Sequence, residues 1–179
     1  MAEAKRNGGW ARKLTWLAVA LSIGGLAAAL IAASAAIAQP PAQRLDAATA
    51  QAIVSGCARH ASGRNQSHGI AVVDPGGHVV AALRMDGNGH GIMDFALAKA
   101  RAAAAWGFPT SAMAEAVRGT PGFAGAPHVV TVPGGVPIYA RDGTTRLGAV
   151  GVSGEAPADD VACAEAGIAA AGLRPRPDR

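Results

Sequence analysis

Apolar runs and turn residues alternate over residues 69–84. The apolar runs are Ile70–Val73 and Val79–Leu83, and Asp74-Pro75-Gly76-Gly77 separates them. Proline fixes φ at the first position of a turn, and glycine can adopt the positive φ that a tight reversal requires. The pattern therefore predicts a β-hairpin.

Helical periodicity marks the segments on both sides of this hairpin. Asp46 is a candidate N-cap for a helix that ends near Ser62, because apolar residues recur there at i, i+3, i+4 and i+7. A second, alanine-rich helix is predicted from Gly91 to Trp106, and it ends in Gly107-Phe108-Pro109-Thr110. The other expected elements are a short helix ending near Arg118, strands near 128–132, 136–140 and 146–152, and a helix over 158–171.

This order of elements predicts one α+β domain, with an antiparallel sheet of about five strands and helices packed against it in two layers. Residues 45–173 carry the domain, residues 39–44 are a Pro-containing linker, and residues 174–179 are expected to be a disordered, charged tail. Only 4% of the residues are aromatic, so the core must consist mainly of Ala, Val, Ile and Leu.

The first 38 residues have the pattern of a secretory signal peptide. Four basic residues precede an uncharged stretch over 14–38, and Ala36-Ile37-Ala38 fits a small-x-small cleavage site before Gln39. The stretch is also long enough to span a bilayer, which needs about 20 apolar residues, so an uncleaved anchor is the alternative. Both alternatives place the domain outside the cytoplasm, either periplasmic or secreted after cleavage, or at the inner membrane facing outward.

Removing residues 1–38 changes the charge of the chain. The whole sequence has 16 Lys and Arg against 12 Asp and Glu, but the leader holds four of the basic residues and Glu3. Residues 39–179 therefore carry 12 basic and 11 acidic side chains, a net charge of +1. This balance does not support nucleic-acid binding, and a membrane contact is expected only through residues 14–38 if they are retained.

Cys57 and Cys163 are the two cysteines of the chain, and they fall in the first and last predicted helices of the domain. In an oxidising compartment such a pair is a candidate disulfide. The alternative is a pair of buried thiols that pack as small apolar residues. The sequence does not show whether the two Cα atoms come within bridging distance, so both alternatives stay open.

Several short motifs follow one another in order along the domain. They are the hairpin with its exit Arg84-Met85-Asp86-Gly87, the helix that contains Lys99-Ala100, the stop Phe108-Pro109-Thr110, and the segments Pro133–Ile138, Leu147–Gly154 and Asp160–Gly167. Together they resemble the GlcG/HbpS-like family of small haem-associated proteins over roughly residues 45–173. The resemblance implies a profilin- or PAS-like α+β fold, a homo-oligomer, and haem or another tetrapyrrole as ligand.

A haem site needs an apolar wall, an axial ligand for the iron and cations for the propionates. Among the five histidines, His90 is the leading ligand candidate, because glycines on both sides allow a flat molecule to approach the backbone. The resemblance adds Thr110 as a second candidate ligand. Phe108 offers apolar surface, and the candidate cations are Arg84, Lys99 and Arg101. His78 and His128 are the next ligand candidates if these residues do not form the site.

Enzyme signatures are missing from the sequence. Gly151-Val152-Ser153-Gly154 lacks the spacing of a nucleophile elbow, and Gly87–Gly91 lacks the last glycine of a dinucleotide-binding fingerprint. Haem degradation is thus an expectation from the resemblance alone. The leading hypothesis is an extracytoplasmic protein that holds haem reversibly. The alternative is a sensor of a small organic acid, or an accessory interaction module, without metal.

Overall fold

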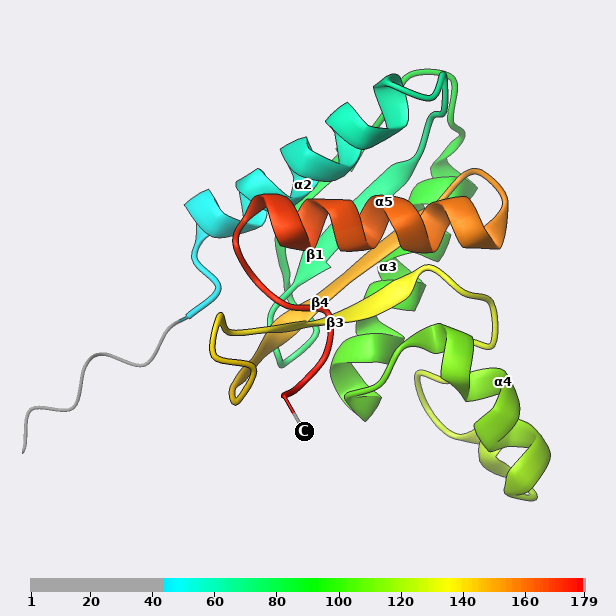
Figure 1. The fold of residues 1–179 in the computed structure, drawn as a ribbon. Helices are drawn as coiled ribbons and strands as arrows, with labels where there is room; N and C mark the ends of the chain where they lie inside the picture. Colours follow the sequence, from blue (N-terminus) through cyan, green and yellow to red (C-terminus); the bar gives the residue numbers. More distant parts are fainter. Residues whose placement is uncertain (1–43, 179) are drawn as a thin grey trace, which may run out of the picture. The chain divides into compact units, whose positions relative to one another are not determined.

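The computed structural model describes residues 44–178, in which two pairs of consecutive strands are separated and flanked by helices (Figure 1). The helices are α2 (Ala47–Ser62), α3 (His90–Trp106), α4 (Thr110–Gly119), the short 3₁₀ helix η1 (Phe123–Gly125) and α5 (Pro157–Ala170). The strands are β1 (Gly69–Val73), β2 (Val79–Arg84), β3 (Gly135–Tyr139) and β4 (Arg146–Ser153). The predicted signal or anchor segment lies outside the described residues. In the part that is described, no helix has the length and apolar character needed to cross a membrane.

The four strands form one antiparallel sheet in the order β2-β1-β4-β3. The hairpin predicted at 69–84 is the β1–β2 pair, in which Ile70 lies opposite Leu83. β1 and β4 are the central strands, and β3 is an edge strand. An edge strand can accommodate Pro137, which has no backbone N–H to donate.

The expectation of about five strands is wrong for residues 128–132, since the described residues contain four strands. His128 has a φ of 58°, which lies outside the β region, and Pro133 follows before β3 begins. The tail that was predicted to be disordered begins with Arg174, and this residue pairs with the last residue of β3. Arg174 and Tyr139 exchange two backbone hydrogen bonds of 2.8 and 3.1 Å next to β3.

Helices cover both faces of the sheet, so the domain has three layers and not the two that were predicted (Figure 1). Ile70 and Val72 of β1 pack toward α2 and α5, whereas Ala71 and Val73 pack toward α3. Every residue of β1 is buried, which is typical of a strand covered on both faces. Its unbroken apolar run is the sequence signal for the third layer.

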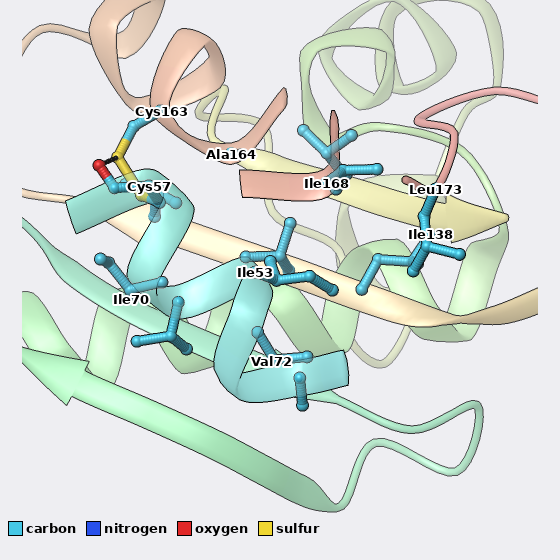
Figure 2. Close-up of a cluster of buried hydrophobic side chains, with 14 of the residues drawn as sticks. Ile53, Cys57, Ile70, Val72, Ile138, Cys163, Ala164, Ile168 and Leu173 are labelled. Carbon is cyan, nitrogen blue, oxygen red and sulfur yellow. Dashed lines mark hydrogen bonds between the residues drawn. A yellow bond between two sulfur atoms is a disulfide. The ribbon is translucent and has the colours of Figure 1, made fainter. Parts of the chain in front are cut away.

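The core between the sheet and helices α2 and α5 contains the larger aliphatic side chains (Figure 2). Ile53 of α2 and Ile168 of α5 are fully buried there. Cys57 and Cys163 form a disulfide with their Cα atoms 4.6 Å apart. Of the two alternatives, a disulfide or a pair of free buried thiols, the structure therefore has the disulfide. The helices approach so closely that a Cβ on Gly167 would lie 2.5 Å from the Ile53 carbonyl oxygen.

The core on the opposite face consists mainly of alanines. Ala96, Ala100 and Ala103 of α3 are fully buried against β1 and β4. A Cβ on Gly151 of β4 would collide with the carbonyl oxygen of Ala96, so this strand position requires glycine. The small residues bring the α3 backbone close to the sheet and leave Arg101 on its exposed side.

Candidate functional site

Two adjoining hollows of about 240 and 280 Å³ follow the exposed side of α3, and we call them together the α3 groove. Both are lined by Arg101 and His128, and the first extends to His78 at the β1–β2 turn. The other lining residues are Pro75, Gly76, Gly77, Asp94, Leu97, Ala98, Ala105 and Val130. Small-molecule pockets usually measure about 300–1,000 Å³, so the combined groove has the size of a ligand site.

The β1–β2 turn places a carboxylate beside a histidine at one end of the α3 groove. Asp74 Oδ1 accepts hydrogen bonds from the backbone N–H groups of Gly76 and His78, both at 2.9 Å, and lies 3.3 Å from His78 Nδ1. These hydrogen bonds, above all that from the His78 backbone, lower the pKa of Asp74 below its ordinary value of 3.8. Asp74 is therefore an anion at neutral pH, next to an imidazole that is 82% exposed.

Arg101 and His128 lie in the middle of the α3 groove. Arg101 Nε donates to the Gly77 carbonyl oxygen at 3.2 Å, which ties α3 to the β1–β2 turn. His128 is exposed, and its positive φ of 58° is uncommon for a residue with a side chain. The preceding Pro127 carbonyl accepts a hydrogen bond from Trp106 Nε1 at 3.1 Å, so the loop that carries His128 is anchored to α3.

A second polar cluster lies inside the domain, where α3, α5 and the start of β1 meet. Lys99 Nζ donates to Asp160 Oδ2 at 2.8 Å and to the Val152 carbonyl oxygen at 2.9 Å. His68 Nδ1 lies 3.1 Å from Asp160 Oδ1, and the three ionisable side chains are at most 2% exposed. The ammonium also lies 4.8 Å from the centre of the Phe95 ring. This cluster is a buried ion network closed to ligands, with a role in stability.

Lys99 is thus not the surface cation that the sequence analysis expected. Its ammonium is 1% exposed and already paired with Asp160, so it offers no charge to a propionate in this conformation. The helical repeat puts position 99 on the sheet-facing side of α3, next to Ala96 and Ala103. A single lysine among alanines did indicate a special position, but that position is part of the core.

The structure places the other predicted site residues at opposite ends of α3. His90 is exposed at the first position of this helix, and Arg84 ends β2 shortly before it. Phe108 and Thr110 follow the other end, and a helix of 17 residues is about 25 Å long. Within one chain, His90 and Thr110 therefore cannot ligate the same iron. Thr110 is also fully buried, and its Oγ1 accepts the N–H of Gly135 at 2.9 Å.

Asp74 and His78 form a chemical unit that was not predicted from the sequence. The available signal was the turn itself, because an aspartate that opens a turn often accepts hydrogen bonds from backbone N–H groups two to four residues later. His78 directly follows that turn, so its ring reaches the same carboxylate. The place of His128 beside Arg101 had no such local signal, since it depends on how the loop after α4 packs against α3.

Another hollow, of about 400 Å³, adjoins the same turn and differs in chemistry. Its lining residues are Arg44, Leu45, Asp74, Pro75, Thr145, Arg146 and Leu147. These side chains offer two cations and apolar surface but no imidazole, thiol or thioether for a metal. The α3 groove is therefore the better match to a ligand that contains iron.

Known proteins resemble this chain in fold and, to a lesser extent, in sequence. The family model described as haem degrading protein HbpS-like matches residues 45–169. Protein GlcG of Escherichia coli strain K12 is 39% identical over 105 residues, which are 58% of this chain and 77% of GlcG. A double mutant of HbpS from Streptomyces reticuli matches with a TM-score of 0.66 and 28% identity, over 73% of this chain and 89% of that one. A complex of PduOC with heme matches in fold, with a TM-score of 0.67 and 21% identity, over 75% of this chain and 99% of that one.

Proposed function

The chain belongs to the HbpS-like family, whose model is described as haem degrading, and on this premise we propose that it binds haem in the α3 groove. The family resemblance stated from the sequence motifs is confirmed by the family model and by the identity to GlcG. A fold neighbour, PduOC, has been solved in complex with heme. These relatives support haem-related binding, and the groove supplies a place for it.

The combination of side chains in the α3 groove carries the proposal. Haem is a flat, largely apolar ring with an iron that takes axial ligands and with two anionic propionates. His78 and His128 offer imidazoles to the iron, and Arg101 offers a guanidinium to a propionate. Leu97 and Val130 add apolar surface in the adjoining hollow. The bound group would supply a redox-active iron, while these residues hold and orient it.

The shape of the groove supports reversible binding. All its lining residues are exposed or half-buried, and His78 is 82% exposed. A ring that lies in such a groove keeps part of its surface in water, so less apolar area leaves the solvent than in a closed pocket. The protein therefore exchanges its ligand and does not retain it permanently.

An extracytoplasmic location is part of the proposal. The leader pattern supports it, and a buried disulfide fits an oxidising compartment, because structural disulfides are rare in the cytosol. N-terminal sequencing of the protein from its native host should find Gln39 first, whereas full-length protein in the membrane fraction would indicate an anchor. A homo-oligomer is likewise proposed, and sedimentation of the same material tests it.

Hemin titration of the purified protein tests the haem proposal. We expect a saturable shift of the Soret band, with weaker binding by Arg101→Ala and by the double variant His78→Ala/His128→Ala. His60→Ala and His90→Ala are matched controls, because each removes an imidazole that does not line the groove. His68→Ala is unsuitable as a control, since it breaks the contact with Asp160.

Two outcomes would contradict this proposal. Loss of hemin binding in His90→Ala, with the groove variants unchanged, would move the site to the N-terminus of α3. An unchanged spectrum in the wild-type protein, together with stabilisation by a small organic acid, would favour the sensor alternative.

A further inference from the structure

We infer that His78 is the residue whose imidazole would ligate the haem iron and that the Asp74 carboxylate positions this imidazole, an inference that rests on the proposed haem binding. All five histidines lie within residues 44–178, and among these residues two of them, His68 and His78, have a carboxylate partner. His68 is fully buried, whereas His78 is 82% exposed and lines the α3 groove. In the described part of the chain, His78 alone combines a carboxylate partner with an accessible ring.

The contact between Asp74 and His78 selects one form of the imidazole. A carboxylate only accepts hydrogen bonds, so the proton of the neutral ring is favoured on Nδ1, which lies 3.3 Å from Asp74 Oδ1. Nε2 then keeps its lone pair, and this is the atom that can bind a metal. Histidines that ligate metals commonly donate their other ring N–H to a carboxylate, which orients the ring and raises its basicity.

Asp74 is itself held in place by the turn. Its Oδ1 accepts the backbone N–H groups of Gly76 and His78 at 2.9 Å each. The carboxylate is therefore fixed relative to the backbone segment that carries the imidazole. A ligating side chain supported in this way needs less reordering when the metal arrives.

The cation of the groove is tied to the same turn. Arg101 Nε donates to the carbonyl oxygen of Gly77, the residue before His78. The imidazole and the guanidinium thus reach one hollow from two elements, the β1–β2 turn and α3. Arg101 is then the residue that would pair with a propionate. His128 lines this hollow too, without a carboxylate partner among the described residues, and is the competing ligand.

Hemin complexes of the full chain test this assignment with His78→Ala, Asp74→Asn and His128→Ala. We expect His78→Ala to lose the signature of imidazole ligation in optical and electron paramagnetic resonance spectra, and added imidazole to restore it. His128→Ala should keep the wild-type signature. Asp74→Asn retains an oxygen for the two backbone hydrogen bonds but loses the charge. Loss of a group that orients a ligating histidine usually lowers metal affinity about 10–100-fold, and we expect this range together with a shifted midpoint potential.

A measurement on the ligand-free protein tests the positioning role without haem. Nitrogen chemical shifts of the His78 ring at neutral pH should show the proton on Nδ1 in the wild-type protein. In Asp74→Asn the population should move toward the form that carries the proton on Nε2. Circular dichroism of both proteins checks that the fold is retained.

The outcomes separate this inference from the proposed function. If the wild-type protein does not bind hemin, both fail. If it binds hemin and His78→Ala keeps the imidazole signature, the ligand assignment alone is overturned, and loss of the signature in His128→Ala identifies that histidine instead. Wild-type affinity, potential and ring protonation in Asp74→Asn would overturn the positioning role.

Discussion

The buried cluster of Lys99, Asp160 and His68 leads to a quantitative prediction of stability. Lys99→Met removes the ammonium but keeps an unbranched side chain in its place. The Asp160 carboxylate, 2% exposed, is then left with the His68 ring and the backbone N–H of Glu155 as partners. Removing one partner of a buried ion pair costs about 3–5 kcal/mol, because the other charge stays buried without compensation. We expect a decrease of that size in the free energy of unfolding.

The double variant Lys99→Met/Asp160→Leu separates the effect of charge from that of packing. It removes both charges and leaves the His68 ring without its partner, and an unpaired buried polar group costs about 1–3 kcal/mol. The double variant should therefore be at least as stable as Lys99→Met alone. Asp160→Leu by itself should be strongly destabilised, because it leaves the ammonium uncompensated.

Urea unfolding followed by circular dichroism, with the disulfide intact, measures these differences. Arg101→Met is a matched control, since it removes an exposed cation from the same helix and should change the free energy of unfolding by less than about 1 kcal/mol. Two results would refute the reasoning. One is a decrease below about 1 kcal/mol for Lys99→Met, and the other is additivity of the two single effects in the double variant.

Reduction of the disulfide between Cys57 and Cys163, which are 106 residues apart, should lower the free energy of unfolding by about 4–5 kcal/mol. Thiol titration of the unfolded, unreduced protein should find no free thiol, and two free thiols would contradict the bridge. Thr110→Val should cost about 1–3 kcal/mol in urea unfolding, because the buried N–H of Gly135 loses its acceptor. Its hemin spectrum should match the wild type, and a changed Soret band would return Thr110 to the site. The folded-state pKa of Asp74 lies below 3.8, so its contribution to stability is present above the unfolded-state pKa and is lost as the pH falls through the folded-state pKa. Asp74→Asn should therefore be less stable than the wild type at neutral pH, and the difference should shrink as the pH falls through the folded-state pKa, whereas a constant difference in unfolding free energy would argue against this role.

Local structure depends on signals a few residues long, and for most of the elements of this chain those signals were sufficient. The turn residues at 74–77 predict the hairpin that β1 and β2 form. Asp46 caps α2 as expected, because its carboxylate accepts the Thr49 N–H at 2.7 Å. The helix predicted over 91–106 differs from α3 by one residue. Ordered motifs of this kind also identified the family, which the family model confirms.

The errors concern what covers a surface or pairs with a segment, which short signals specify only in part. Residues 128–132 are rich in β-branched side chains, as a strand would be, but Val130 lines the α3 groove and the segment pairs with no strand. The domain was expected to have two layers, with helices on one face of the sheet only. The unbroken apolar run of β1 shows in retrospect that both of its faces are covered.

The sequence by itself determined which chemical groups exist and which near neighbours meet. Asp74 and His78 are four residues apart, and the turn between them is enough to bring carboxylate and imidazole together. Only the tertiary structure decided the pairing of Lys99 with Asp160, which are 61 residues apart, and the position of Arg101 in the groove. The physical reason is that backbone geometry constrains distances over a few residues. The distance between remote side chains is set only when helices α3 and α5 pack against the completed sheet.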